Sequence, residues 1–225
     1  MRILIVTATT GEIAPLVARL RPTAERGRLR RHTYATHDVD VLTTGVGMVP
    51  TAVWCSRTLA AGEYDMALNV GVCGTFDRAL PLGTVVHVVS DRLPEVGAED
   101  GEAWLSIHEL GLLDENEFPF HGGELVNLAP PDNAALRALP EVGAMTVNAV
   151  HGSDRSIARV LAQAAARVES MEGAAFMYAC LVHGLPFAQV RAVSNVVERR
   201  NRAAWKMPEA IAALNASALD ILNHV

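Results

Sequence analysis

The feature that most constrains this chain is an alternation of short apolar runs with segments that have helical spacing. The runs 2–8, 39–43 and 66–72 are rich in Val, Ile and Leu, which is typical of strands buried on both faces. Such an alternation predicts an α/β fold, a three-layer αβα sandwich around a mixed, mostly parallel central sheet. We expect strands at 2–8, 39–43, 66–72, 85–90, 145–150 and 187–194, and helices at 12–20, 50–61, 156–166, 173–183 and 208–223.

Composition narrows the class of protein. The 225 residues suit one domain spanning 1–225, and half of them are apolar, which is enough for a sizeable core. The net charge of −6 argues against a nucleic-acid partner, so the basic cluster 26–31 is interpreted as a solvated face. No apolar run approaches the ~20 residues of a membrane span, so no membrane partner is expected. The widely spaced Cys55, Cys73 and Cys180 predict reduced thiols in a cytoplasmic protein and no metal site.

The apolar pattern weakens between residues 93 and 131. Turn residues are frequent there, and the stretch 114–117 is mostly acidic. We interpret this region as a long surface excursion that serves as a lid or as a subunit contact.

Small and polar residues follow several of the predicted strands. Glu12 comes after the first strand, Gly45 after the second, Gly71 at the end of the third and Asn195 after a late one. Ligands of open α/β sheets bind beyond the carboxyl ends of the strands, where these residues are expected to meet. The coincidence predicts a binding site at that edge of the sheet.

The glycine motifs by themselves do not indicate a nucleotide cofactor. The 45–47 segment reads Gly-Val-Gly, but Pro50 replaces the third glycine of a dinucleotide-binding loop. The loop 71–75 could approach a ligand with its backbone, yet no Walker lysine follows it. A tight strand-to-helix turn is the plainer interpretation of the first motif, and the second is a bent turn as often as a site.

Two glutamates stand in positions that favour a functional role. Glu12 opens a helix, where a carboxylate is stabilised by the helix dipole whether or not it has another function. Glu172 lies among small and apolar residues that suggest burial, and a buried carboxylate needs hydroxyl or amide donors. Sugar hydroxyls would supply such donors, although a glutamate that points to the surface of its helix is the alternative.

Taken in order, these segments resemble the nucleoside phosphorylase and nucleosidase superfamily, beginning with Glu12. The resemblance rests on the glycine loop at Gly71, on Met171-Glu172-Gly173-Ala174-Ala175 and on Arg191-Ala192-Val193-Ser194-Asn195. Within that superfamily the chain is most similar to the futalosine hydrolases of menaquinone biosynthesis, through the segments 97–101, 169–173 and 194–205. The order and spacing of the segments, over nearly the whole chain, are more specific than any single motif.

The resemblance implies a nucleoside phosphorylase-like fold, a homodimer, a small purine nucleoside as substrate, and neither a metal nor an organic cofactor. Position by position, Glu12 would activate the attacking water, while Glu172 would hold the ribose hydroxyls and Met171 would pack on the sugar. Gly71, through its loop backbone, and Ser194 are counted among the substrate-binding residues, and Asn195 would meet the purine. The adenine-specific relatives have aspartate at the position of Asn195, and some have serine where Val72 stands.

The residue type at position 195 indicates which purine base the site would bind. Hypoxanthine presents a carbonyl oxygen where adenine has an amine, and an ionised carboxylate would repel that oxygen. An amide can donate to the oxygen and accept from a protonated N7. A mismatch would leave buried polar groups unpaired at a cost of about 1–3 kcal/mol. Asn195 therefore predicts a 6-oxopurine, against the alternative of a capping or turn asparagine.

The predicted activity is hydrolysis of the N-glycosidic bond of futalosine, which releases hypoxanthine and dehypoxanthine futalosine. The alternatives are a 6-oxopurine nucleoside phosphorylase, an adenine-releasing methylthioadenosine/adenosylhomocysteine nucleosidase and a nucleoside-binding protein without turnover. The benzoate of futalosine would need a cationic or amide partner, for which the sequence offers Arg155, Arg199, Arg200 and Arg202 without selecting one. Trp205 is either an aromatic wall of the site or a core residue.

Overall fold

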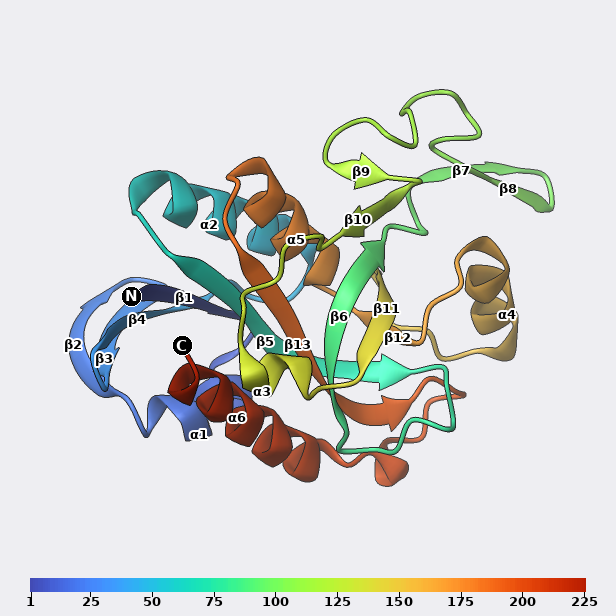
Figure 1. Cartoon of the computed structure of the whole chain (residues 1–225). Helices are drawn as coiled ribbons and strands as arrows, with labels where there is room; N and C mark the ends of the chain where they lie inside the picture. The colour runs from blue at the N-terminus through green and yellow to red at the C-terminus, as the bar shows by residue number, and fades with distance from the viewer.

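The computed structural model describes all 225 residues and has a mixed sheet of 11 strands at its centre (Figure 1). Ten strands follow in the order β2-β3-β4-β1-β5-β12-β11-β6-β10-β9, and β13 pairs with both β5 and β6. Their bounds are β1 Arg2–Thr7, β2 Arg21–Arg26, β3 Leu29–Tyr34, β4 His37–Thr43, β5 Met66–Thr75, β6 Val85–Arg92, β9 Phe120–His121, β10 Glu124–Val126, β11 Glu141–Thr146, β12 Val168–Ser170 and β13 Phe187–Val196. A separate hairpin joins β7 (Gly97–Asp100) to β8 (Ala103–Ser106).

Helices cover both faces of the sheet (Figure 1). On one face α1 (Thr10–Val17) and α3 (Ala134–Arg137) pack against α6 (Met207–Asn223), and on the other α2 (Met48–Ala61) packs against α5 (Gly173–Val182). Alternate residues of β1 belong to different cores, because successive side chains of a strand point to opposite faces. Ile3 and Ile5 join the core with α1 and α6, whereas Leu4 and Val6 join the core with α2 and α5. The αβα layering predicted from the sequence is confirmed.

The sheet also closes on itself, a feature that the sequence does not reveal. The strands β5, β12, β11, β6 and β13 form a ring, because β13 pairs with β5 in parallel and with β6 in antiparallel. A third apolar cluster, with Val86, Val142, Val168 and Val193 among its members, draws on strands of this ring. The ring fixes β5 between β12 and β13, so the side chains of both neighbours can meet over it.

Several expected segments differ from the structure. The basic cluster 26–31 belongs to the β2–β3 hairpin, which was not predicted because β2 is exposed along its whole length and lacks an apolar alternation. The strand expected at 145–150 lies earlier, at Glu141–Thr146. The excursion 93–131 is only in part a surface segment, since its strand β10 pairs with β6 and its Leu125 is fully buried.

Asn215 of α6 fixes the helix that carries Glu12. Its Oδ1 accepts a hydrogen bond from the Leu16 amide at 2.8 Å, and its Nδ2 donates to the Glu12 carbonyl at 2.7 Å. The side chain is buried, so these bonds satisfy groups that water cannot reach.

The remaining α-helix, α4 (Asp154–Gln163), is preceded by Ser153, whose hydroxyl accepts from the Ser156 amide as an N-cap. No helix of the chain is both long and apolar enough to span a bilayer.

Candidate functional site

Glu12, the glycine loop 45–47 and Asn195 lie where parallel strands end, whereas Gly71, expected at the end of its strand, lies inside β5, which continues to Thr75. β1 runs parallel to β4 and β5, and β13 runs parallel to β5, so their carboxyl ends share one edge of the sheet. Glu12 follows β1, the glycine loop 45–47 follows β4, and Asn195 is at the end of β13. Glu172 follows β12 and is the N-cap residue of α5.

Gly71 allows two charged groups to approach each other. It stands directly opposite Arg191 in the β5–β13 register. A Cβ at this position would collide with the Arg191 guanidinium and would lie 3.2 Å from Glu12 Oε1. The absence of a side chain therefore lets the carboxylate of Glu12 and the buried guanidinium of Arg191 share this space.

Both carboxylate oxygens of Glu12 accept hydrogen bonds. Oε2 accepts from the amide and the hydroxyl of Thr9, at 2.9 and 2.8 Å, in the capping-box arrangement of a helix start. Oε1 accepts from the Val72 amide at 3.2 Å, which ties α1 to β5. Glu12 is thus a first-turn helix carboxylate and also a member of the cluster around Gly71.

Glu172 is buried and is held by one hydrogen bond and one ion pair. Its Oε1 accepts from the Gly47 amide at 3.0 Å, and its Oε2 lies 3.7 Å from Arg191 Nη1. Gly47 adopts φ +100°, a conformation that L side chains rarely adopt, so the amide can face Glu172 only because this residue is glycine. The surface-pointing alternative for Glu172 is wrong, because its side chain is 7 % exposed.

Arg191 connects these groups, although the sequence offered it no role of its own. Its side chain is 1 % exposed, Nη2 donates to Asn69 Oδ1, and Nε has no hydrogen-bond partner within the protein. A buried guanidinium is costly unless it is paired, and Glu172 is the carboxylate within 4 Å. Arg191 is the first residue of the motif 191–195, but only its register opposite Gly71 shows what the side chain contacts.

Asn195 and Ser194 lie at an irregularity in β13. The register shifts between Val193 and Asn195, so that Ser194 is the extra residue and Asn195 pairs with Gly74. The Ser194 hydroxyl donates to the Cys73 carbonyl at 3.1 Å and lies 2.9 Å from Asn195 Oδ1. Asn195 Nδ2 donates to the Val196 carbonyl at 3.1 Å. Both polar atoms of the amide have partners on its own strand, and a ligand would have to replace them.

Glu169 and His151, which were not predicted as site residues, accompany Asn195. Gly74 pairs with Glu169 on one side and with Asn195 on the other, and its missing Cβ would lie 3.6 Å from Glu169 Cγ and 3.2 Å from Asn195 Nδ2. His151 Nδ1 is 2.7 Å from Glu169 Oε2, and the His151 amide donates to Oε1 at 3.1 Å. Burial raises the pKa of Glu169, and hydrogen bonding to His151 opposes that rise. Glu169 lies in the segment 169–173, which carries part of the resemblance to the futalosine hydrolases, and this segment was the only sequence signal for a role of Glu169.

These residues line one small pocket together with Trp205 and Arg200. Trp205 is therefore at the wall of the pocket rather than in the core, with the Arg200 guanidinium 5.4 Å from its ring centre. Of the four arginines considered for a carboxylate, Arg200 alone lines this pocket, whereas Arg155 extends from α4 toward Glu102. Met171 is half-buried before α5. No group of three His, Cys, Asp or Glu side chains is arranged to hold a metal ion.

Comparisons with known proteins identify the family of the chain. The family model of the phosphorylase superfamily matches residues 2–223. The chain belongs to the phosphorylase superfamily. It is 31 % identical over 188 residues to the futalosine hydrolase of Streptomyces coelicolor (78 % of this chain, 74 % of the relative). It is 32 % identical over 176 residues to that of Thermus thermophilus (77 % and 76 %).

A solved structure shows the same fold. The methylthioadenosine/adenosylhomocysteine nucleosidase of Colwellia psychrerythraea, determined with adenine, superimposes with a TM-score of 0.82 at 20 % identity, over 100 % of this chain and 95 % of the other. The superfamily resemblance seen in the sequence is confirmed.

Asp91 is a further buried carboxyl group near Arg191. Asp91 of β6 is fully buried and accepts hydrogen bonds from Thr146 Oγ1 at 2.9 Å and from Gln189 Nε2 at 3.1 Å. Burial raises the pKa of Asp91 to about 6, although both hydrogen bonds and the charge of Arg191 favour its ionised form. Gly173 makes room for it, since a Cβ there would collide with Asp91 and Gln189.

The raised pKa predicts a pH-dependent loss of stability that Asp91→Asn should remove. An unfolded aspartic acid ionises near pH 4, whereas Asp91 in the folded state keeps its proton up to about pH 6. The folded state binds the extra proton between those values, so this group's contribution to the free energy of unfolding falls as pH rises from about 4 to about 6. Chemical denaturation between pH 4 and 7 gives the free energy of unfolding of the wild type and of D91N. As pH rises to about 6, this free energy should increase in D91N relative to the wild type, and above that pH the difference should stay constant. Parallel curves, like those expected for the control Asp100→Asn at an exposed aspartate, would contradict the assignment.

Proposed function

We propose that this protein hydrolyses the N-glycosidic bond of futalosine, releasing hypoxanthine and dehypoxanthine futalosine as a step of menaquinone biosynthesis. The observation that carries the proposal is the convergence of Asn195 and Glu169 over Gly74. We place Glu12 and Glu172, which gather around Arg191 near Gly71 on the same strand, on the other side of that site. The two futalosine hydrolases that are 31 % and 32 % identical to this chain support the substrate.

The carboxylates suit the charges that develop during the reaction. Cleavage of an N-glycosidic bond builds positive charge on the ribose, as in the related cleavage of O-glycosides. We assign Glu12 as the base that takes a proton from water while the water oxygen attacks the anomeric carbon. Glu172 accepts from the ribose hydroxyls, and Met171 packs on the sugar. Arg191 keeps Glu172 in place, and the carboxylate charge favours the cationic sugar.

The polar groups over Gly74 suit a 6-oxopurine. The Asn195 amide donates to the carbonyl oxygen of hypoxanthine and accepts from N7, which takes a proton from solvent as the base leaves. A 6-oxopurine also carries a hydrogen on N1, where adenine has a bare acceptor, and the carboxylate of Glu169 can accept from it. His151 orients Glu169 through its two contacts with that carboxylate. Ser194 and the backbone of the Gly71 loop complete the substrate-binding set.

Hydrolysis is favoured over phosphorolysis because the carboxylate of Glu12 lies beside Gly71. A phosphate dianion would need several converging donors, and the amides of Thr9 and Val72 are already bonded to Glu12. The carboxylate of Glu12 would itself repel the dianion at this place. Water, which can donate to Glu12, meets no such barrier.

The test is product analysis with futalosine in phosphate-free buffer. We expect stoichiometric release of hypoxanthine without phosphate, and Glu12→Gln should lose roughly 10²–10⁴-fold in turnover because the general base is removed. Glu109→Gln is the matched control, since Glu109 accepts from the amide and hydroxyl of Ser106, both at 2.8 Å, in the same way but outside the site. Strict dependence on phosphate, or release of adenine from methylthioadenosine instead, would refute the proposal. A full rate in E12Q would remove Glu12 from the mechanism.

We also propose that the enzyme is a cytoplasmic homodimer. Its three cysteines are free and buried, which suits a reducing compartment. Apolar side chains are exposed on the packed pair α2 and α5, with Val49 74 % and Val182 52 % exposed. A second copy that packs on α2 and α5 would cover these side chains. Light scattering should give twice the chain mass of 24.1 kDa, and a monomer mass would contradict the dimer.

A further inference from the structure

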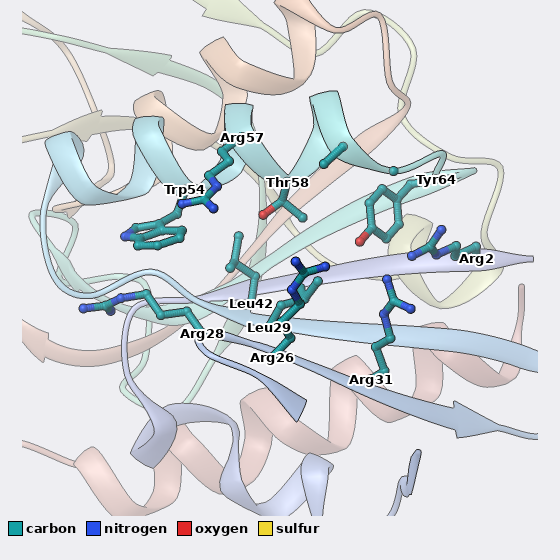
Figure 2. Close-up of a pocket in the computed structure, with 12 residues that line it drawn as sticks. Arg2, Arg26, Arg28, Leu29, Arg31, Leu42, Trp54, Arg57, Thr58 and Tyr64 are labelled. Atoms are coloured by element: carbon teal, nitrogen blue, oxygen red, sulfur yellow. The ribbon is translucent and has the colours of Figure 1, made fainter. Parts of the chain in front are cut away.

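A second pocket, of about 250 Å³, lies between α2 and the edge of the sheet formed by β2, β3 and β4 (Figure 2). It shares no residue with the pocket that contains Asn195. We name it the arginine pocket because five arginines line it, Arg2, Arg26, Arg28, Arg31 and Arg57. Figure 2 shows Arg26 and Arg31 extending from the strands toward α2, from which Trp54 and Arg57 project.

The charges of this pocket are not balanced within the protein. Asp40, which is buried beside it, pairs with Arg2 at 2.9 Å and with Arg31 at 3.9 Å. Arg26, Arg28 and Arg57 have no carboxylate within 4 Å. Asp38 and Asp65 also lie near Arg2, but no carboxylate lines the pocket itself, so its five guanidinium groups leave a local excess of positive charge in a chain whose net charge is −6. A local excess of this kind attracts a multiply charged anion.

The lining of the pocket suits the oxygens of a phosphate group. Leu29 and Leu42 contribute apolar surface, which lowers the local polarity and strengthens charge interactions. Trp54 has guanidinium carbons of Arg57 and Arg28 at 5.2 and 5.5 Å from its ring centre, so the aromatic ring helps to hold both cations near the pocket. Guanidinium groups present paired donors that match phosphate oxygens.

We propose that the arginine pocket binds a small, multiply charged phosphate anion of the pyrophosphate class. The chemistry is that of a diphosphate group, either free or carried by a nucleotide. This site is independent of the proposed hydrolysis of futalosine, because none of its residues belongs to the candidate active site.

One arginine connects the pocket to the active-site loop and is therefore left intact in the test. Arg28 Nη1 donates to the carbonyls of Thr43 and Thr44, at 3.3 and 3.0 Å, immediately before the loop whose Gly47 amide binds Glu172. Arg26 and Arg57 have no such bond and are exposed, so replacing them should not disturb the fold.

Calorimetric titration of the full chain with inorganic pyrophosphate, at fixed ionic strength, tests the proposal. Pyrophosphate should bind more tightly than phosphate or sulfate. The double variant Arg26→Gln/Arg57→Gln should weaken its binding by about tenfold or more, equivalent to a loss of roughly 1.4 kcal/mol. The matched control Arg21→Gln/Arg30→Gln removes two arginines from the same hairpin, outside the pocket, and should retain wild-type binding. The single variant R57Q gives the same test if the double variant unfolds at a lower temperature.

A second calorimetric titration, with ADP in place of pyrophosphate, distinguishes a free diphosphate from one carried by a nucleotide. Binding of ADP that depends on Arg26 and Arg57 assigns a nucleotide, and binding of pyrophosphate alone assigns the free anion. The proposal is overturned if pyrophosphate binds no tighter than sulfate or if R26Q/R57Q binds it as wild type does. Tighter binding of an RNA oligonucleotide than of pyrophosphate at the same ionic strength would also overturn it.

Discussion

The site depends on two positions of β5 that carry no side chain. Gly71 stands opposite Arg191, and Gly74 stands between Glu169 and Asn195. A Cβ at Gly71 would collide with the Arg191 guanidinium, and a Cβ at Gly74 would collide with Val197 and press against the Asn195 amide, because side chains of paired residues on one face lie close together. The ring of strands fixes β12 and β13 on both sides of β5, so the polar side chains of both neighbours meet over glycine rather than over an apolar residue. The strand pairing that closes the ring therefore also positions the polar side chains of the site.

Arg191 makes this concentration of acidic groups tolerable. Glu12, Glu172 and Asp91 all lie near its buried guanidinium, which contacts Glu172 and favours the ionised form of Asp91. Without that cation a buried carboxylate would be costly and would take up a proton. The bond from Gly47 to Glu172 adds the glycine loop to the same cluster. Contacts within the protein thus hold in place Glu12 and Glu172, the two carboxylates that the proposed chemistry uses.

The sequence predicted what depends on local pattern and missed what depends on long-range pairing. The helix at Gly173–Val182 and the strand at Phe187–Val196 were expected within two residues of their ends, because their apolar runs are continuous. The hairpin β2–β3 was missed because exposed, arginine-rich strands resemble a solvated surface. Glu12, Gly71 and Glu172 were expected to share a site and lie around Arg191. His151 was not found, since its contact with Glu169 joins segments 18 residues apart and only folding brings them together.

The most direct test of the base assignment is the preference of Asn195→Asp between futalosine and its 6-amino analogue. If Asn195 reads the carbonyl oxygen of hypoxanthine, the variant should lose about 5–150-fold in kcat/KM for futalosine, the range for a mismatch of 1–3 kcal/mol, and lose much less for the analogue. Asn116→Asp, on the surface, should leave the preference of the wild type in place. An unchanged preference in N195D would show that residue 195 does not recognise the base.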